Sequence, residues 1–200
     1  MKAAIALLVD QETQNAVRSL VWEMHSSHGL NFRASRLPPH ISLKQPFEVA
    51  DLRPLASYFD QVAAGIAPFE VQLEQMQLIP VDMHGMQTAI LWMDVGRSHI
   101  LLQQHERLNR ELAQRFGNTA AAHDGARYHF HLTLMLGDQP IGSYRDAFEL
   151  YKDRLAHTRC SVKELALFIY DADVFSPEAG ERAAADYMLL KTVPLGGAAS

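Results

Sequence analysis

Short segments follow one another along this chain, and their apolar residues recur either with the spacing of a strand or with the spacing of a helix. This pattern limits the chain to folds that contain both strands and helices. Segments 2–9, 69–80 and 88–95 have the length and alternation of strands. Residues 12–28 and 98–116 instead place apolar side chains at helical spacing, and a glycine that can end a helix follows each of them. The expected strands and helices do not alternate strictly along the chain. This order predicts an α+β protein with largely antiparallel sheets.

The rest of the chain continues this mixture. Further strands are expected at 40–47, 128–136, 161–171 and 186–193, and further helices at 51–66 and 143–156. Two stretches rich in Gly, Ala and polar residues, 117–126 and 172–185, are expected to be loops. With 200 residues, of which 48% are hydrophobic, the chain is long enough to bury one sizeable core or two small lobes packed together.

Charge and cysteine content limit the partners and the compartment. The formal net charge of -5 argues against a protein that coats long nucleic acid, but it leaves a small anion or one end of a nucleic acid as a partner. Cys160 is the only cysteine, which rules out an intramolecular disulfide and a thiolate metal cage and favours a reducing cytoplasm. Asp10 interrupts the apolar N-terminal stretch, and no other run reaches the ~18 residues of a membrane span. We therefore expect a soluble, cytoplasmic protein with no membrane partner.

One short pattern occurs twice: a histidine, an aliphatic residue, a hydroxyl residue and a leucine. It reads HISL at 40–43 and HLTL at 131–134, and both copies lie in segments that predict strands. Side chains in a strand alternate between its two faces, so each copy has one polar face and one core face. Two prolines precede the first copy and fit the start of a strand, close to a loop. The polar pairs are His40 with Ser42 and His131 with Thr133.

Two histidines beside two hydroxyl groups suit phosphoester chemistry. Because histidine titrates near neutrality, a pair can supply one neutral base and one protonated acid at the same time. One imidazole removes a proton from the attacking oxygen, and the other donates a proton to the leaving oxygen. The hydroxyls donate hydrogen bonds to the non-bridging phosphate oxygens, and this scheme requires no metal.

The two motifs resemble the paired His-x-Ser/Thr-hydrophobic motifs of the two-histidine phosphoesterase superfamily, which includes 2'-5' RNA ligase-like proteins and cyclic nucleotide phosphodiesterases. The resemblance spans most of the chain. It implies a bilobal α+β fold, in which two pseudo-twofold-related lobes of largely antiparallel sheet, with helices outside, face each other across a central cleft. We accordingly expect one two-lobed domain at 1–195 and a disordered tail at 196–200.

The same resemblance implies the roles of the motif residues. His40 and His131 correspond to the catalytic acid and base, and Ser42 and Thr133 correspond to the residues that bind phosphate. The implied substrate is a 2',3'-cyclic phosphate of a nucleotide or an RNA end, or a related cyclic phosphate. Ligation of RNA ends through a 2'-5' bond is the reverse of the same bond reaction, and neither direction needs a cofactor.

Several residues outside the motifs are further candidates for the site or the core. Lys44 is expected on the strand face of His40 and Ser42, where it either contacts phosphate or is solvated. Trp22 and Trp92 lie in apolar segments and are expected in the core. Candidate substrate contacts, by base stacking or anion binding, are Arg127, Tyr128, His129 and Tyr170. Histidines expected to be solvated are His25, His28, His84, His99, His105, His123 and His157.

Two alternative functions stay open. His129 and His131 share a strand face and can chelate a metal if His40 or Asp124 completes the set, which would make a metal-dependent hydrolase. That interpretation leaves the hydroxyl residues of both motifs unexplained. The second alternative is a protein that binds a nucleotide in the cleft without turning it over.

Overall fold

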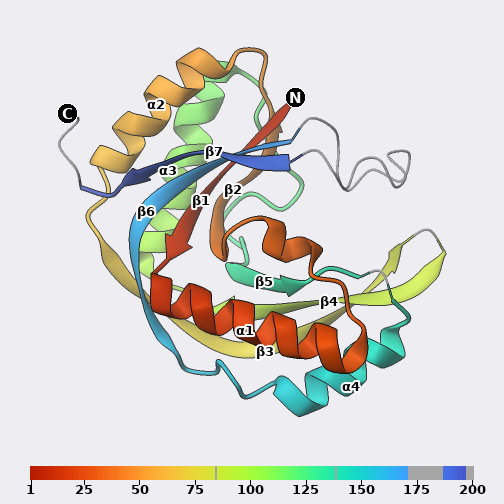
Figure 1. The fold of residues 1–200 in the computed structure, drawn as a ribbon. Coiled ribbons are helices and arrows are strands. Elements are labelled where there is room, and N and C mark those ends of the chain that lie inside the picture. Colours follow the sequence, from red (N-terminus) through yellow and green to blue (C-terminus); the bar gives the residue numbers. More distant parts are fainter. Residues whose placement is uncertain (84, 138, 171–186, 197–200) are drawn as a thin grey trace.

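The structure is a computed structural model that describes residues 1–83, 85–137, 139–170 and 187–196, and Figure 1 shows its course. The strands are β1 (Lys2–Val9), β2 (His40–Glu48), β3 (Phe69–Met83), β4 (Met86–Val95), β5 (His131–Met135), β6 (Arg159–Tyr170) and β7 (Tyr187–Pro194). The helices are α1 (Gln11–His28), the short 3-10 helix η1 (Arg33–Arg36), α2 (Leu52–Ala64), α3 (His99–Phe116) and α4 (Ile141–Tyr151).

The strands form one open sheet, ordered β2-β1-β6-β3-β4-β5, with β7 paired to β6. All strand pairs in the described ranges are antiparallel. The long strand β3 belongs to both halves, because its first residues pair with β6 and the rest pairs with β4. The sheet therefore consists of two lobes joined at β3, which confirms the predicted α+β class. The motif strands β2 and β5 lie at its two ends.

Each lobe has its own helices. α2 packs against β6 and β7, and α3 packs against β2, so both cover the first lobe. α4 packs against β3 and β4, and α1 packs against β5 and α4, so this pair covers the second lobe. Figure 1 shows the two helix pairs at opposite ends of the molecule, with β2 and β5 between them. No helix in the described ranges is long and apolar enough to cross a membrane.

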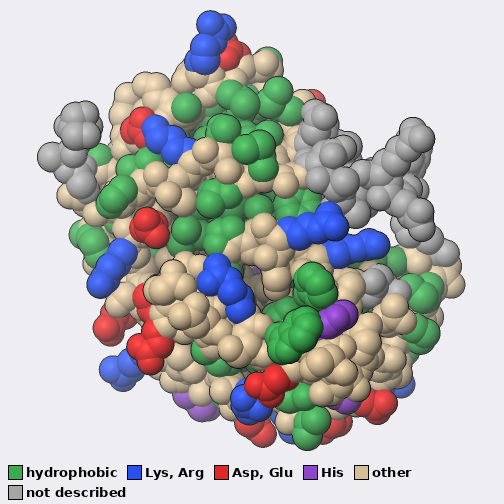
Figure 2. Space-filling model, viewed as in Figure 1, with side chains coloured by type: hydrophobic (Ala, Val, Ile, Leu, Met, Phe, Trp, Pro, Cys, Tyr) green, Lys and Arg blue, Asp and Glu red, His purple; other side chains and the backbone are tan. Residues whose placement is uncertain are grey.

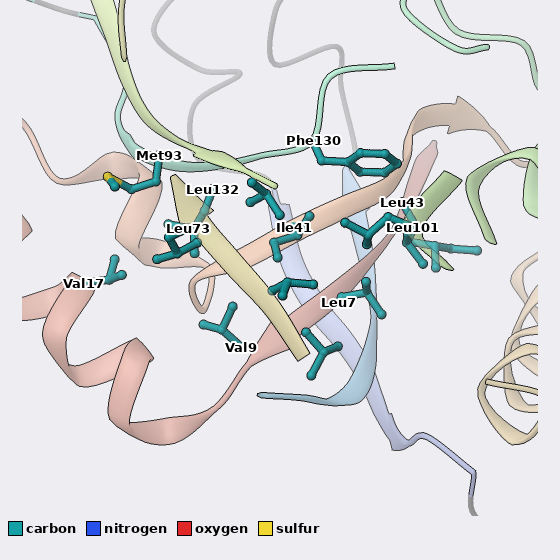
Figure 3. Packing of buried hydrophobic residues seen from close by; sticks show 14 of the residues in the cluster. Leu7, Val9, Val17, Ile41, Leu43, Leu73, Met93, Leu101, Phe130 and Leu132 are labelled. Atoms are coloured by element: carbon teal, nitrogen blue, oxygen red, sulfur yellow. The ribbon is translucent and has the colours of Figure 1, made fainter. Parts of the chain in front are cut away.

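The apolar half of each motif lies in the main hydrophobic core (Figure 3). Ile41 and Leu43 of the first motif and Leu132 and Leu134 of the second are completely buried. Burying a side chain of this size contributes about 1.5–3 kcal/mol, so each motif strand is fixed to the core by its alternate residues. This confirms the predicted core faces and places the polar half of each motif on the opposite side of the sheet.

A second, smaller apolar cluster lies on that opposite side in the first lobe. It contains short side chains of β1 and β6, together with Leu37 and Phe168. Ala6 is paired with Ser42 and Leu8 with His40 across the β1–β2 ladder. Because directly paired residues share a face, His40 and Ser42 lie beside this cluster. The short side chains are Ala4, Ala6 and Ala166.

Most predicted element boundaries agree with the structure, and two helix ends show why. Asp51 caps α2 by accepting a hydrogen bond from the amide of Arg53, as expected for an N-cap residue. Gly29 ends α1 with a left-handed φ of 67°, which glycine adopts without strain. The expected loop at 172–185, residues 197–200 of the expected tail and His84 lie outside the described residues.

Two expected element boundaries and the expected burial of Trp22 were wrong. The strand predicted to begin at 128 begins at His131, because the amide of Tyr128 donates to the carbonyl of Gly125 in a turn. The helix predicted over 143–156 is α4, which ends at Tyr151. Trp22 is 61% exposed rather than buried, because it lies off the apolar stripe of α1 that packs on the sheet.

Candidate active site

His40 begins β2 and faces the smaller apolar cluster. Its ring lies 4.6 Å from that of Phe168, between ring centroids. Its Nδ1 lies 2.9 Å from the carbonyl oxygen of Pro38. A carbonyl oxygen can only accept, so Nδ1 carries the proton and donates it. Nε2 is therefore the atom that can exchange a proton with a ligand.

His131 begins β5 and repeats this arrangement in the second lobe. Its Nδ1 lies 3.0 Å from the carbonyl oxygen of His129, which is again the residue two positions earlier. The ring stacks on Trp92, with centroids 4.4 Å apart and an interplanar angle of 26°. Both motif histidines thus have the same tautomer for the same local reason, and each keeps Nε2 for chemistry.

The fold brings the two histidines together although they come from opposite ends of the sheet. β2 and β5 contact each other across the opening of the sheet. The electrostatics agree with this contact, since a proton on His131 lowers the pKa of His40, although less than burial does. The predicted convergence of the two motif strands is therefore present.

Burial lowers the pKa values of both rings, but the neighbouring groups that oppose this shift differ between the two positions. Desolvation by burial is the main cause for His40 and lowers its pKa to about 4, against the hydrogen bond to Pro38. Desolvation is also the main cause that lowers the pKa of His131, against the hydrogen bond to His129; the charge of His129 lowers this pKa further, and the carboxylate of Asp94 raises it by a smaller amount. The second lobe therefore contains a charge that favours protonated His131.

Asp94 was not predicted as a site residue. It is paired with His131 across the β4–β5 ladder, and Trp92 is paired with Thr133. Oδ1 of Asp94 accepts hydrogen bonds from Nε1 of Trp92 at 2.8 Å and from Nε2 of His129 at 2.7 Å. Oδ2 accepts from the amide nitrogen of Gln77 at 2.9 Å. Asp94 therefore holds in place the tryptophan on which His131 stacks.

The surroundings of His131 correct the prediction for Trp92. The side chain is half-buried on the polar face of β4 rather than in the core. The alternation of 88–95 already places Trp92 and Asp94 on one face, opposite Leu91 and Met93. What the sequence does not contain is the register that sets this face beside the second motif.

Ser42 and Thr133 are half-buried, each on the same face as its motif histidine. They are the hydroxyl donors that the two strands offer beside the two imidazoles. The chemistry available to this arrangement is proton exchange at two Nε2 atoms, with hydrogen bonds from hydroxyl groups to an anion.

Lys44 does not share the face of His40 and Ser42, so that prediction was wrong. A bulge in the β1–β2 ladder sets Ser42 opposite Ala6 and Lys44 opposite Ile5, with an extra residue of β2 between them. The bulge turns Lys44 toward the core side, where its side chain is completely buried. Its ammonium group forms an ion pair with Asp124 and lies 5.9 Å from the ring centroid of Phe47.

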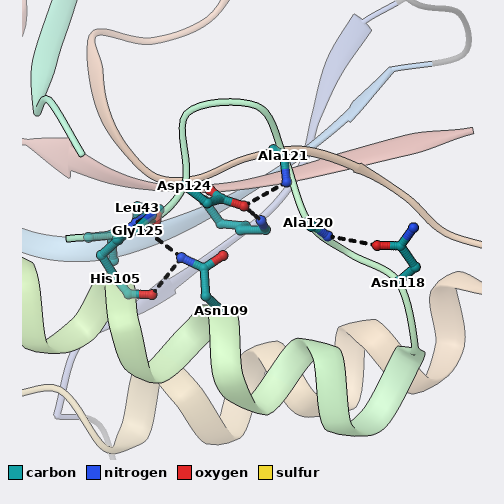
Figure 4. Close-up of polar contacts among 9 residues, drawn as sticks. Leu43, His105, Asn109, Asn118, Ala120, Ala121, Asp124 and Gly125 are labelled. Atoms are coloured by element: carbon teal, nitrogen blue, oxygen red, sulfur yellow. Dashed lines mark hydrogen bonds and ion pairs between the residues drawn. The ribbon is translucent and has the colours of Figure 1, made fainter. Parts of the chain in front are cut away.

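His105 was expected to be solvated, but it is completely buried (Figure 4). Its Nδ1 donates to the carbonyl of Leu43 at 2.7 Å, and its Nε2 accepts from the amide of Gly125 at 3.1 Å. Asp124 also accepts from the amide of Ala121 at 2.8 Å. The loop before β5 is therefore fastened both to α3 and, through Lys44, to β2.

The four candidate substrate contacts lie in three different surroundings. Arg127 and His129 line a cavity of about 310 Å³ next to Asp94, on the His131 side of the site. Tyr170 packs on the cluster that contains Phe168, on the His40 side. Tyr128 borders the same cavity, but it is only 4% exposed and its ring stacks on His105 at 4.0 Å, so little of the ring is accessible for base stacking.

The ligand set of the metal alternative is not assembled. Within the described residues, no three His, Cys, Asp or Glu side chains converge on one point. Asp124 is ion-paired with Lys44, and Nε2 of His129 is hydrogen-bonded to Asp94. The geometry gives this alternative no support.

Comparisons with known proteins agree with this arrangement. A model of the 2'-5' RNA ligase superfamily matches residues 9–174.

Among solved structures, TT0787 of Thermus thermophilus is 15% identical with a TM-score of 0.64, and the match covers 98% of this chain and 99% of that one. E. coli LigT complexed with 3'-AMP is 14% identical with a TM-score of 0.54, covering 97% of both chains. A phosphoesterase is 14% identical with a TM-score of 0.51, covering 97% of this chain and 98% of that one. A search of curated proteins found no match. At such identities the structural likeness shows a shared fold.

Proposed function

Because this chain belongs to the 2'-5' RNA ligase superfamily, we propose that it is a metal-independent phosphoesterase acting on the 2',3'-cyclic phosphate of a nucleotide or an RNA end. One observation carries the proposal. Two motif strands from different lobes meet, and each offers a histidine whose Nδ1 is occupied and whose Nε2 is left for a ligand. LigT complexed with 3'-AMP, a nucleotide monophosphate, has the same fold and supports this substrate class.

In the proposed hydrolysis, water attacks the phosphorus atom of the cyclic ester. One imidazole Nε2 takes a proton from the water, and the other donates a proton to the ribose oxygen whose bond to phosphorus breaks. The product is a phosphate monoester with a free neighbouring hydroxyl. Ser42 and Thr133 donate hydrogen bonds to the non-bridging oxygens, which carry increased charge in the transition state. In the proposed ligation of RNA ends, the 5'-hydroxyl of a second RNA takes the place of water: its oxygen bonds to the phosphorus after giving its proton to the base, the bond from phosphorus to the 3'-oxygen breaks, and the acid protonates that oxygen.

The two lobes differ around their histidines, and this difference supports one assignment of the two roles. His40 has a pKa lowered to about 4, so it is neutral over most of the physiological range and serves as the base. His131 lies beside Asp94, whose charge favours the imidazolium, so it serves as the acid. Trp92 and Asp94 support this acid but do not touch the reacting atoms.

The proposed function is tested by a screen of 2',3'-cyclic, 3',5'-cyclic and linear nucleotides with a chelator present. We expect turnover of 2',3'-cyclic phosphates only, and no effect of the chelator. Chromatographic separation of 2'- from 3'-monophosphate products identifies the bond that breaks. Turnover that the chelator abolishes would contradict the metal-independent mechanism, and tight nucleotide binding without turnover would favour the non-catalytic alternative.

The two pKa shifts predict the pH dependence of kcat/KM. Activity should rise as His40 loses its proton near pH 4 and should fall as His131 loses its proton below pH 6.5, its ordinary value. Replacement of Asp94 by asparagine removes the charge that favours protonated His131, so the alkaline limb should move to lower pH while the acid limb stays. Measured pH profiles of both proteins check this. An unmoved alkaline limb in Asp94→Asn would contradict the assignment of His131 as the acid.

Loss of a motif hydroxyl should weaken phosphate binding more than turnover. Ser42→Ala and Thr133→Val each remove one hydrogen bond to a charged oxygen, which corresponds to about 10- to 100-fold in affinity. The inhibition constant of inorganic phosphate and the KM of the cyclic substrate measure this effect. Thr133→Ser keeps the hydroxyl and serves as the matched control. Unchanged constants in both hydroxyl-free variants would show that these groups do not contact the phosphate.

A further inference from the structure

An exposed aromatic group lies at the edge of the candidate site. Trp22 on α1 is 61% exposed and Phe32 at the start of η1 is 48% exposed. His25 joins them, with its ring centroid 5.4 Å from that of Trp22 and 4.7 Å from that of Phe32. We call these three residues the aromatic platform. Neither core packing nor the proposed reaction requires their exposure.

The platform is held in one arrangement. Nδ1 of His25 donates to the carbonyl of Leu30 at 2.7 Å, which ties the end of α1 to the segment that carries Phe32. The ring of Phe32 meets that of His25 edge to face, at 90°. Exposed rings that are fixed in this way lose little conformational entropy when a planar group stacks on them.

The segment that carries Phe32 connects the platform to both halves of the site. The side-chain amide Nδ2 of Asn31 donates to the carbonyl of Leu136, just after β5, at 3.0 Å. The hydroxyl of Tyr187 on β7 donates to the carbonyl of Arg33 at 2.5 Å. Eight residues after Phe32 the same segment reaches His40. The segment that carries Phe32 thus lies between the platform and the two motif strands.

Three arginines lie near the platform, and the acidic Glu23 beside Trp22 is paired with Arg154. Arg18 lies one helical turn before Trp22, and Arg33 and Arg36 make up both ends of η1, all three with exposed side chains. Figure 2 shows hydrophobic, histidine and Lys or Arg side chains gathered over the second half of α1 and the short helix that follows it. Exposed aromatic rings beside arginines are the combination by which proteins stack the bases and neutralise the phosphates of single-stranded RNA.

We propose that the aromatic platform and the η1 arginines bind the nucleotides that precede the terminal cyclic phosphate of a single-stranded RNA. This inference rests on the proposed function and deepens it, because it makes an RNA end, rather than a free mononucleotide, the preferred substrate. The overall charge of -5 does not oppose this, since the positive side chains are concentrated on one short track.

The test compares adenosine 2',3'-cyclic phosphate with a penta-adenylate that ends in a 2',3'-cyclic phosphate. Trp22→Ala and Phe32→Ala should lower kcat/KM for the pentanucleotide by about 5- to 100-fold each, the usual effect of losing one stacked base. The value for the mononucleotide should not change. Ile100→Ala removes an exposed apolar side chain from α3 and is the matched control. Arg33→Gln should reduce the slope of log affinity against log salt by about 0.7.

A binding measurement separates this inference from the proposed function. Quenching of tryptophan fluorescence by a penta-adenylate with a linear 3'-phosphate needs no turnover. Trp92 stacks on His131 and responds to the phosphate itself, so the quenching that reports on the platform is the part that Trp22→Phe removes. If neither cyclic substrate is turned over but this quenching is present, the result contradicts the proposed function and supports RNA binding by the platform. If the platform variants leave pentanucleotide kcat/KM and quenching unchanged, the platform is wrong whatever the activity, and a different partner covers it.

Discussion

Turnover of a 2',3'-cyclic phosphate should fall by about 10²- to 10⁴-fold when either His40 or His131 is replaced by alanine, which is the usual contribution of a positioned acid or base. Each variant removes one of the two proposed proton-transfer atoms, the Nε2 that remains when Nδ1 donates to a backbone carbonyl. Because the two groups act in one step, the double variant should be little worse than the single ones. Single-turnover rates at saturating substrate measure the chemical step itself.

The control for this prediction is His99→Ala, which removes an exposed histidine at the start of α3 and should leave turnover unchanged. Circular dichroism and a urea midpoint near that of the wild-type protein show that the catalytic variants are folded. Turnover within about tenfold of the wild type in either motif variant would contradict the two-histidine mechanism.

Removal of Asp124 should destabilise the protein by about 3–5 kcal/mol, because it leaves the completely buried ammonium group of Lys44 without a counter-charge. Urea unfolding of Asp124→Ala measures this change. The double variant Lys44→Met/Asp124→Ala should recover most of the loss, since methionine fills a similar volume without charge. The expected cause is therefore the unpaired charge rather than a missing contact.

The exposed pair Lys152–Glu149 provides the comparison for the buried one. Lys152→Ala should leave the urea midpoint unchanged, because solvent screens a pair at the surface. Equal destabilisation of Asp124→Ala and the double variant would show that the ion pair itself is not the source of the effect. Loss of catalysis in Asp124→Ala under conditions where it stays folded would show that this loop also positions the motif strands.

The site described here depends on two lobes that support their histidines differently. His40 packs on Phe168 and lies beside an apolar cluster, so it is held in its neutral form. His131 stacks on Trp92, and Asp94 provides a charge beside it. The nearly symmetric motifs therefore acquire unequal proton affinities from their neighbours, which is what a reaction needing one acid and one base requires.

Much of this site followed from local sequence alone. The period of two in a strand placed His40 with Ser42 and His131 with Thr133, and put the aliphatic residues of both motifs in the core. Capping residues and glycines set several helix boundaries for reasons that act within a few residues. These features are determined by nearest neighbours along the chain.

Tertiary structure decided the rest, because strand register and the meeting of distant strands depend on non-local pairing. One bulge against β1 reversed the face of Lys44, although the strand pattern placed it with Ser42. The register between β4 and β5 set Trp92 and Asp94 beside the second motif. The sequence alone thus determined which side chains share a strand face, whereas the pairing of distant strands determined which of those faces meet at the site.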